Sequence, residues 1–424
     1  MYQKYKIRLL RSFWKKFPRA IQRLILSIFS PVVASVLLKR RKIDKGPLTI
    51  AGLMRSATGL GEGARQHLFA SKNSGIDTRY TDIGKWFPWL SEINIDLGKE
   101  STICSGGIVV MHINPLELGM VIPLLGKNYF KHKRIVGYWA WELSYLPLEW
   151  RRAVNIVDEI WVPSGFIADA LSPFTGNEIK IIPHPVQTPV PLQVGRSYFG
   201  IPEGVFVVLM MFDMRSCAAR KNPFDAIKAF KMAFGGSEDA CLIVKVGTPD
   251  ESKEIMRAIQ AEIQGKNNIR LFFGRLDKDE QASLIDSVDV YISLHRSEGF
   301  GLVLAEAMLL GKPVIATGYS GNMDFMSPEN SAVIGYELIP VNDPQNIYSF
   351  EGALWAQPVI QEAADWLMRF YKNKNLRHTL GEKAKESARN IFDIKSYNKA
   401  VIDTIGDYYE WPVNKPLNDQ RSQY

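Results

Sequence analysis

The chain has 424 residues but only three cysteines and six histidines, and both shortages limit the chemistry that it can support. Cys104, Cys217 and Cys241 are odd in number and far apart, which indicates neither a disulfide framework nor a pair of metal ligands. No two histidines have the His-x-x-x-His spacing of a helical zinc site. We therefore expect a protein of a reducing compartment that has no zinc centre.

The sequence also lacks an apolar run long enough to cross a bilayer as a helix. Residues 24–38 form an apolar segment that contains Pro31, and they fall short of the roughly 20 residues that a spanning helix needs. Around this segment, residues 1–45 carry 13 Lys and Arg against one acid, Asp44, a net charge of +12. The whole chain carries +8, and subtracting +12 leaves −4 for the rest. The basic excess is local, so we expect no nucleic-acid partner.

Three interpretations of residues 1–45 remain open. A cleaved signal peptide would have a basic start and a short apolar core, but the basic run 39–42 directly after the core opposes translocation. The segment could instead pack on its own domain as a basic extension. We favour an interfacial anchor on anionic lipid, which would place the protein in the cytoplasm at the inner face of the membrane.

The remaining pattern predicts an α/β protein of two domains. A hydrophobic content of 46% and an aromatic content of 11% suit a folded chain, and the length suits two or three domains. Short β-branched runs alternate with helical stretches, which is typical of doubly wound parallel sheets. We place the domains at 46–190 and 197–395, with a proline-bearing linker at 187–196 and a final helix and tail at 396–424.

Residues 288–325 form the most informative unit, with the order strand, loop, helix, strand. An apolar run is followed by a polar, glycine-bearing turn at 297–301, and the helical stretch after it ends at Gly311. In a parallel sheet this turn lies at the carboxyl edge of the strands, where such sheets bind ligands. Ser320, Gly321 and Asn322 follow the next strand and are candidates for sugar or phosphate contacts at the same edge.

Two carboxylates, Glu298 and Glu306, mark this unit. Eight helical steps rise about 12 Å, which exceeds the roughly 5–10 Å between paired carboxylates that hydrolyse one glycosidic bond. The spacing suits two groups that hold different parts of one long ligand. On spacing alone, two solvated glutamates on a surface helix are the favoured explanation, because the pattern is a loose one.

Basic and glycine-rich segments supply further candidates. Arg215, Arg220 and Lys221 stand just before a helix that starts at Pro223, which suits an anion site as well as it suits a solvated basic loop. The stretch Gly59–Arg65 would bring backbone N–H groups close to a phosphate or sugar, or would simply form a tight turn.

Residues of the first domain carry weaker signals. His112 ends the apolar run 108–111 and either faces the cleft or is structural. Ser164 follows a predicted strand at 158–162, and we expect its side chain to cap a helix. A tryptophan cluster could stack on sugar faces, but we favour a core role for it. The cluster consists of Trp139, Trp141 and Trp150.

Three of these stretches resemble the large retaining glycosyltransferase family 4, part of the glycosyl transferases group 1. They are SEGFGLVLAEAMLLGKPVIAT at 297–317, RKNP at 220–223 and GYWAWELSYLPLEWRRAVNIVDEIWVPSGFIADAL at 137–171. The resemblance implies a GT-B fold, in which two Rossmann-like domains face each other across a cleft. It also implies that Glu298 contacts the donor sugar and Glu306 the nucleotide ribose. The backbone along the sugar and diphosphate would be that of Gly299, Phe300, Gly301 and Leu302.

The same resemblance suggests roles for the other candidates. In the family, an Arg and a Lys with the spacing of Arg215 and Lys221 neutralise the donor diphosphate. This branch usually has a small polar residue at position 215, so Arg220 is an alternative to Arg215. His112 would lie near the transferred sugar. The glycine-rich loop of the first domain, with Gly61, Glu62 and Gly63, would face the donor diphosphate or the acceptor, and Asn322 would join the donor site.

The implied function is retaining transfer of a sugar from a nucleotide diphosphate to a hydroxyl of a glycan. We expect no cofactor and no divalent metal, because the cations would neutralise the diphosphate and we find no Asp-x-Asp motif placed to hold an ion. The N-terminal extension favours a lipid-linked acceptor in bacterial surface polysaccharide or lipopolysaccharide assembly, and GDP-mannose is slightly favoured as donor. The alternatives are a sugar phosphorylase, a nucleotide-sugar epimerase, or a non-catalytic membrane scaffold.

Overall fold

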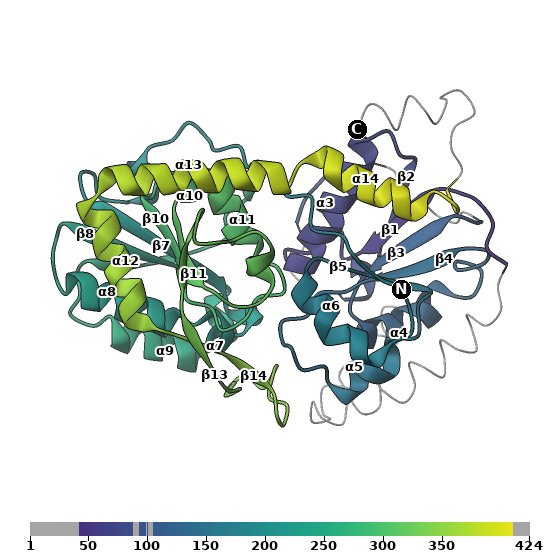
Figure 1. The fold of residues 1–424 in the computed structure, drawn as a ribbon, viewed down its shortest axis with the longest axis horizontal. Helices are drawn as coiled ribbons and strands as arrows, with labels where there is room; N and C mark the ends of the chain where they lie inside the picture. The colour runs from purple at the N-terminus through teal and green to yellow at the C-terminus, as the bar shows by residue number, and fades with distance from the viewer. Residues whose placement is uncertain (1–41, 88–92, 99, 101–104, 410–424) are drawn as a thin grey trace.

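A computed structural model describes residues 42–87, 93–98, 100 and 105–409. Figure 1 shows two α/β domains side by side, each built around a six-stranded sheet with helices on both faces. The predicted extension, apart from residues 42–45, and the predicted tail after residue 409 lie outside the described residues. Within the described part of the chain, no helix combines the length and apolar character needed to cross a membrane.

The first domain is a parallel sheet whose strands have the order β2-β1-β3-β4-β5-β6. Its strands are short and nearly all buried, because helices cover both faces of the sheet. The elements are β1 (Leu48–Gly52), α3 (Gly59–Asn73), β2 (Thr78–Asp82), β3 (Ile108–His112), α4 (Pro115–Leu125), β4 (Arg134–Tyr138), α5 (Leu148–Ala153), β5 (Glu159–Val162), α6 (Gly165–Leu171) and β6 (Ile179–Ile181).

The second domain repeats this plan with the order β12-β11-β10-β7-β8-β9. The order reverses beside β7, and such a switch point opens a crevice at the carboxyl edge. The elements are β7 (Phe206–Asp213), α7 (Ala218–Lys221), α8 (Pro223–Phe234), β8 (Ala240–Gly247), α9 (Lys253–Glu262), β9 (Ile269–Phe273), α10 (Lys278–Asp286), β10 (Val290–Ser293), α11 (Leu302–Leu309), β11 (Val314–Thr317), β12 (Ala332–Ile334), α12 (Ile360–Lys372) and α13 (Lys374–Ile391).

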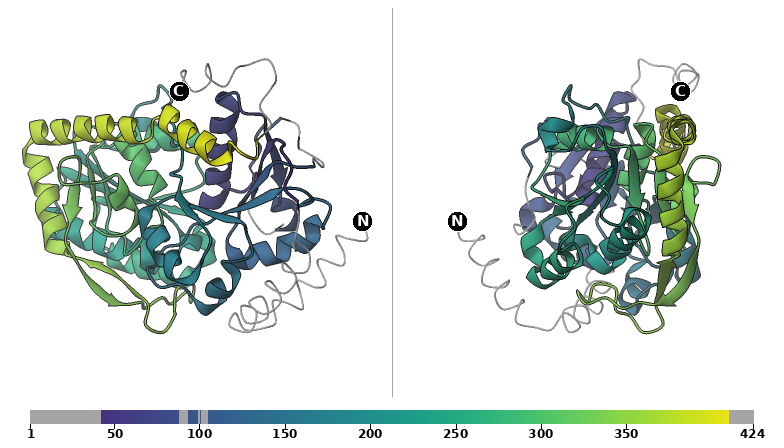
Figure 2. Two further views of the ribbon diagram at one scale, coloured as in Figure 1. Left: turned by 45° about the vertical axis from the view of Figure 1, so that its right-hand side comes forward. Right: turned by 90° about the vertical axis from the view of Figure 1, so that its left-hand side faces the viewer.

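The chain then returns to the first domain. Helix α13 runs along the second domain, and α14 (Ile394–Ile405) lies against α3 of the first (Figures 1 and 2). The hydroxyl of Tyr397 on α14 lies 2.8 Å from Nδ1 of His67 on α3. Gly46 pairs with Tyr409 in an isolated bridge. These contacts tie the C-terminal end of the described chain to the first domain.

A hairpin that the sequence analysis did not predict links the domains on another side. Strands β13 (Tyr336–Pro340) and β14 (Leu354–Pro358) pair in antiparallel fashion and, with their connecting loop, form what we call the hairpin arm, residues 336–358. The arm leaves the second domain, as the left view of Figure 2 shows. Near its tip, the rings of Tyr348 and Phe350 lie 5.8 and 6.0 Å from that of Trp141 in the first domain.

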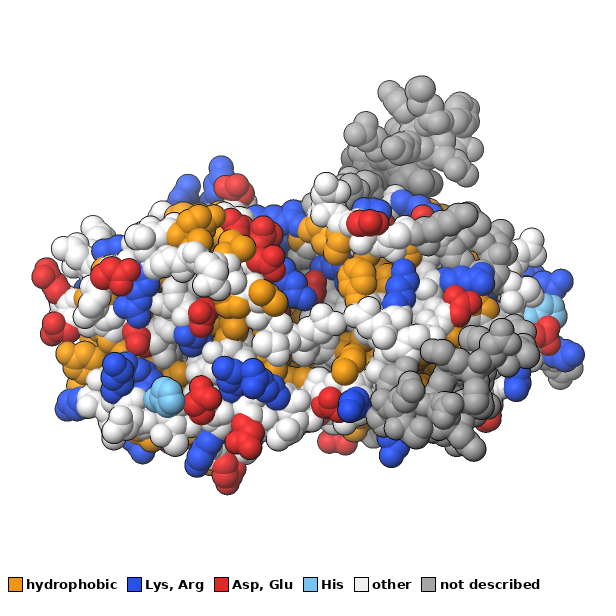
Figure 3. All heavy atoms as spheres, turned by 90° about the horizontal axis from the view of Figure 1, so that it is seen from above, with side chains coloured by type: hydrophobic (Ala, Val, Ile, Leu, Met, Phe, Trp, Pro, Cys, Tyr) orange, Lys and Arg blue, Asp and Glu red, His pale blue; other side chains and the backbone are white. Residues whose placement is uncertain are grey.

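The tryptophan cluster belongs to the core, as favoured from the sequence. Trp139, Trp141 and Trp150 are 0%, 7% and 3% exposed. The rings of Trp141 and Trp150 are 4.7 Å apart, and all three residues pack in the cluster that fills the first domain. Outside the core, acidic and basic side chains are interspersed on the face seen in Figure 3.

The packing of α13 on the second domain depends on one glycine. A Cβ added to Gly381 would lie 2.2 Å from the carbonyl oxygen of Gly311, the second residue after α11. We predict that Gly381→Ala lowers the free energy of unfolding by about 1–3 kcal/mol, because α13 must move away from α11. Urea unfolding measures the loss. Gly236→Ala, where a Cβ would meet nothing within 4 Å, is the control, and an equal loss in both variants would contradict the packing argument.

Candidate active site

A cavity of about 820 Å³ lies between the two domains and has the size of a small-molecule site. The first domain contributes the start of α3 and residues 93–95. The second domain contributes the carboxyl ends of β7, β8 and β9 and the starts of α10 and α11. The cavity therefore lies where the sequence analysis expects the ligand, at the carboxyl edge of the second sheet.

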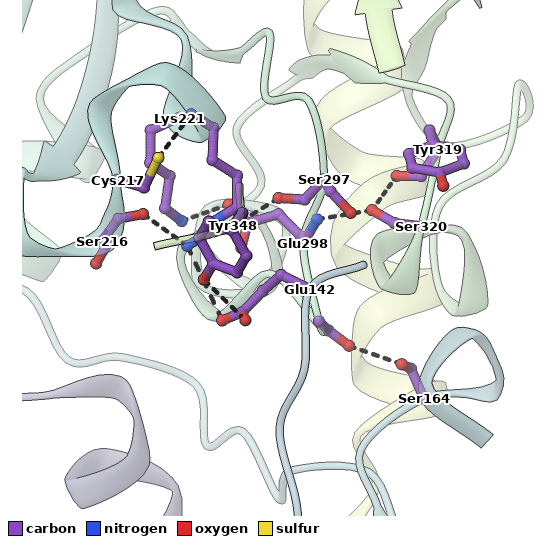
Figure 4. Close-up of polar contacts among 12 residues, drawn as sticks. Glu142, Ser164, Ser216, Cys217, Lys221, Ser297, Glu298, Tyr319, Ser320 and Tyr348 are labelled. Carbon is purple, nitrogen blue, oxygen red and sulfur yellow. Dashed lines mark hydrogen bonds and ion pairs between the residues drawn. The ribbon is translucent and has the colours of Figure 1, made fainter. Parts of the chain in front are cut away.

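Glu298 is the most strongly held carboxylate at this edge. Its residue is 7% exposed, and its two oxygens contact two cations (Figure 4). Lys221 donates from Nζ to Oε1, and Nη1 of Arg220 lies 3.1 Å from Oε2. Burial raises the pKa of Glu298, but Lys221 and Arg220 outweigh burial and bring that pKa down to about 2. Glu298 is therefore ionised at any physiological pH.

The backbone around Glu298 is fixed by the loop that follows β11. The N–H of Glu298 donates to Oγ of Ser320 (2.7 Å), and the N–H of Gly321 donates to the carbonyl of Glu298 (2.9 Å). A Cβ on Gly321 would lie only 2.2 Å from the carbonyl oxygen of Gly299, so the close approach requires glycine. Gly301 has a φ of 102°, which also favours glycine.

Contacts from the first domain close over this loop. Ser164 is the N-cap residue of α6, as predicted, but its side chain makes no capping bond. Its hydroxyl instead donates to the carbonyl of Gly299 across the domain boundary at 2.6 Å. The N–H of Gly165 donates to Asp324 of the second domain at 2.7 Å. The two domains are thus held together beside Glu298.

The three predicted cations have different surroundings. Arg215 and Lys221 line the cavity, and Nε of Arg215 donates to Asp213 at 3.0 Å. Arg220 is 3% exposed and is absent from the cavity lining. Its guanidinium donates to the carbonyls of Ser297 (2.8 Å) and Ser216 (3.0 Å). Arg220 therefore fastens the loop that carries Glu298 and does not face the cavity.

The cavity lining also includes cations that the sequence analysis did not single out, and Lys245 is one of them. Lys245, on β8, lines the same cavity. Burial lowers its pKa, and Asp213 opposes that shift. The sequence did carry a signal, because a lysine within an otherwise apolar strand is unusual in a buried sheet. The cavity is thus lined by Arg215, Lys221 and Lys245 together with Arg65, Arg275 and Lys278, and by the carboxylates Glu62, Asp213, Asp277, Glu280 and Glu306.

Glu306 lies in the cavity on α11, as its position in the sequence suggests. It is 7% exposed, and Nε2 of Gln281 donates to it at 2.9 Å. Burial and the nearby carboxylate of Glu62 raise its pKa to about 7. Glu62 reaches the cavity from α3, paired with Arg65 at 2.7 Å and facing Lys278 of the other domain at 3.6 Å.

The glycines flanking Glu62 are buried for packing reasons. Helix α3 begins at Gly59, so Gly61 and Gly63 lie in its first turns and form no phosphate-binding loop. A Cβ on Gly61 would lie 2.5 Å from the carbonyl of Ser56, and one on Gly63 2.5 Å from the ring of His184. Neither glycine is among the residues that line the cavity.

Glu298, like Arg220, is absent from the cavity lining, and so are three further candidates that are part of the interior. His112 is 1% exposed, and its ring stacks on Tyr138 at 4.3 Å; burial, then the nearby His184, holds its pKa well below the usual value. Phe300 packs edge-on against the ring of His184 at 5.1 Å. Asn322 is fully buried, and its Nδ2 donates to the carbonyl of Thr317 at 3.1 Å.

Of the loop 299–302, only Leu302 lines the cavity among the described residues. No group of three His, Cys, Asp or Glu in the described part of the chain is arranged to hold a metal ion. The sequence contains one Asp-x-Asp stretch, Asp277-Lys278-Asp279, at the start of α10. The carboxylate of Asp277 caps α10 by accepting from the N–H of Glu280 at 2.8 Å.

With this geometry established, the chain can be compared with known proteins. Residues 200–387 match the family model described as Glycosyl transferases group 1. The second domain therefore matches that family. Sequence relatives include an uncharacterized glycosyltransferase of Methanocaldococcus jannaschii, 26% identical over 60% of both chains. A phosphatidyl-myo-inositol mannosyltransferase of Mycobacterium leprae is 26% identical over 54% of this chain and 53% of its own length.

A third relative, N-acetyl-alpha-D-glucosaminyl L-malate synthase of Bacillus anthracis, is 25% identical over 50% of this chain and 49% of its own. The chain thus matches only about half of the length of these relatives. Solved structures cover more of it. HepE of Anabaena, in complex with UDP and glucose, has a TM-score of 0.61 at 15% identity and covers 85% of this chain and 100% of its own.

Sucrose-phosphate synthase of Thermosynechococcus elongatus has a TM-score of 0.59 at 15% identity, with 86% of this chain and 99% of its own covered. At such identities the likeness concerns the fold alone. It confirms the GT-B fold that was expected from the sequence: two Rossmann-like domains that face each other across a cleft.

The raised pKa of Glu306 leads to a prediction about stability. The pKa of Glu306 is about 7 in the folded protein, against 4.5 for the same carboxyl in the unfolded chain. The stabilisation that this difference gives to the folded state is fully present below pH 4.5. That stabilisation, about 3 kcal/mol, is lost as the pH rises through the upper value. In the absence of nucleotide, the free energy of unfolding of Glu306→Gln relative to that of the natural protein should therefore increase as the pH rises from about 5 to about 8.

Urea unfolding at the two pH values measures this gain. Glu203→Gln, which alters an exposed carboxylate, is the control and should follow the natural protein at both. Parallel pH dependence of Glu306→Gln and the natural protein would show that Glu306 is not held in its neutral form.

Proposed function

We propose that this protein is a retaining glycosyltransferase of family 4, which transfers a sugar from a nucleoside diphosphate to a hydroxyl of a glycan. One observation carries the proposal. An interdomain cavity of ligand size is lined by Arg215, Lys221, Lys245 and the carboxylate Glu306 among other charged residues, and Lys221 directly contacts the ionised Glu298. The match of the second domain to glycosyl transferases group 1 supports the same conclusion.

The cations would stabilise the departing diphosphate. Arg215, Lys221 and Lys245 provide positive charge where negative charge develops as the sugar leaves. Their fixed positions in a cavity between the two domains make this stabilisation stronger than it would be in bulk water. Glu306 would accept hydrogen bonds from the ribose hydroxyls. Leu302, beside Glu306 in the cavity, would contact the same nucleotide.

Glu298 would orient hydroxyls of the donor sugar and would not attack the sugar. Both of its oxygens are occupied by cations, which makes it a weak nucleophile. We propose that the acceptor hydroxyl attacks from the face that the diphosphate leaves and passes its proton to the departing phosphate oxygen. The bond to the diphosphate breaks as the new glycosidic bond forms, so the anomeric configuration is retained.

The chemistry proposed here uses no divalent metal. The charge that a metal ion would supply to the diphosphate is supplied by Arg215, Lys221 and Lys245. Asp277 of the Asp277-Lys278-Asp279 stretch caps α10. Binding and turnover should therefore persist when divalent ions are removed by a chelator.

The acceptor is proposed to be lipid-linked, in assembly of a bacterial surface polysaccharide or lipopolysaccharide. The support is the sequence of residues 1–45, where basic clusters flank an apolar segment suited to an anionic membrane surface. GDP-mannose is the first donor to test, since one relative is a phosphatidyl-myo-inositol mannosyltransferase. The UDP bound to HepE makes UDP-sugars the second.

Binding of GDP, UDP, ADP and CMP to the purified protein, measured by calorimetry in the presence of a chelator, tests the proposal. We expect one nucleoside diphosphate to bind. Lys221→Ala and Glu306→Ala should each weaken its affinity by about 10- to 100-fold, because the first removes a cation and the second a hydrogen-bonding carboxyl group.

Lys399→Ala, an exposed change on α14, is the control and should leave the affinity unchanged. Absence of binding by every nucleotide to the folded protein would contradict the proposed function and favour the scaffold alternative. Binding that appears only when a divalent ion is restored would contradict the metal-independent mechanism alone.

Deletion of residues 1–45 tests the membrane proposal. The shortened protein should move from the membrane fraction to the soluble fraction, because the basic clusters contribute about 1 kcal/mol per residue near an anionic surface. Cell fractionation with and without high salt measures the change. A shortened protein that stays with membranes would show that the rest of the chain holds it there.

A further inference from the structure

Arg220 lies between carboxylates from both domains. Its Nη1 is 3.1 Å from Glu298, and its Nη2 is 4.0 Å from Oε1 of Glu142, which follows β4 in the first domain. Together with Lys221, these side chains form a set of two cations and two carboxylates (Figure 4). The set is neutral overall, and one of its four members comes from the opposite domain.

The hairpin arm fixes the position of Glu142. The hydroxyl of Tyr348 donates to Oε2 of Glu142 at 2.9 Å, while the guanidinium of Arg220 lies 5.6 Å from the centre of the Tyr348 ring. Tyr348 is itself held, because its N–H donates to the carboxylate of Asp343 at 3.0 Å and its ring packs on Trp141. Glu142 is therefore oriented by the second domain although it belongs to the first.

Binding of the donor would change which cations pair with Glu298. An arriving diphosphate would draw Lys221 away from Glu298, since Lys221 lines the cavity. Glu298 would then keep Arg220 as its remaining cation partner. Nη1 of Arg220 donates to the Ser297 carbonyl and faces Glu298. Its Nη2 donates to the Ser216 carbonyl and faces the Glu142 carboxylate. If the domains separate, the carboxylate of Glu142 moves away and Nη2 of Arg220 loses its counter-charge.

We propose that Glu142, held by Tyr348 of the hairpin arm, is a positioning residue that orients Arg220, and through it Glu298, only when the two domains are closed. The inference rests on the proposed glycosyl transfer, which it deepens by making the sugar-orienting carboxylate dependent on closure. Glu142 acts through Arg220, and its effect should appear in turnover more than in nucleotide affinity.

Two conservative variants separate this role from a packing role. Glu142→Gln keeps the size of the side chain and an oxygen that accepts from Tyr348, but it removes the charge that faces Arg220. Tyr348→Phe keeps the ring on Trp141 and removes only the hydrogen bond to Glu142. If Glu142 and Tyr348 act as one unit, their effects on turnover will not add.

The experiment measures kcat and KM with the donor whose nucleotide binds in calorimetry. We expect kcat to fall about 10- to 100-fold in Glu142→Gln and about 3- to 10-fold in Tyr348→Phe, as expected for loss of a charged and a neutral partner. The double variant should be no slower than Glu142→Gln by more than about twofold. Nucleoside diphosphate affinity should stay within about threefold of the natural protein, because the cavity cations and Glu306 are untouched.

Tyr198→Phe is a chemically matched control. It removes a tyrosine–glutamate hydrogen bond of 3.1 Å to Glu280, on the surface of the second domain, and should leave kcat unchanged. Natural kcat in Glu142→Gln would overturn the inference while leaving the proposed function intact. Equal losses of nucleotide affinity and kcat would also overturn it, because they indicate a general structural role. A natural protein that binds no nucleotide would overturn the proposed function and this inference together.

Discussion

The architecture around the cleft depends on how the charge of Glu298 is neutralised. A buried carboxylate that loses its partner costs several kcal/mol, so two cations must be placed beside it. Both come from the four-residue helix α7, whose flanking residues Cys217 and Asn222 have φ values of 65° and 55°. Such left-handed conformations cost about 1–3 kcal/mol in non-glycine residues and tend to occur at functional sites.

That strained helix is held by contacts that reach across the second domain. The amide of Asn222 donates to Asp225 (2.7 Å) and to the carbonyl of Leu294 (2.8 Å), which locks the end of α7 to the end of β10. Lys221 is thereby directed into the cavity and Arg220 into the loop of Glu298. The two adjacent residues thus differ in role: Lys221 lines the cavity, and Arg220 stabilises the loop of Glu298.

Closure of the domains completes the site by contacts to the same loop. Ser164 reaches Gly299, and Glu142 reaches Arg220, both from the first domain. Tyr348, on the hairpin arm of the second domain, donates to Glu142 of the first domain. Because each of these bonds is short-ranged, a shift of a few ångströms between the domains would break all of them together. The loop that carries Glu298 is in this way coupled to the first domain.

Local patterns predicted much of the second domain. Helix α8 begins at Pro223 and β11 spans 314–317 as expected, because proline, glycine and apolar periodicity act within a few residues. Glu298 and Glu306 could be placed at one sheet edge for the same reason. Contacts between the domains could not be predicted. Ser164 donates to Gly299 and not to its own helix, and Arg220 points to Ser297 and Glu298 and not into the cavity. These partners lie far from Ser164 and Arg220 along the chain, so no local pattern indicates the contacts.

Turnover of nucleotide sugars by the natural protein and by Lys221→Ala tests the central claim most directly. The account predicts that one nucleotide sugar is consumed with release of its nucleoside diphosphate, that the product keeps the anomeric configuration of the donor, and that Lys221→Ala lowers kcat by about 100-fold or more. Consumption at an equal rate by both proteins, or a product of inverted configuration, would contradict it.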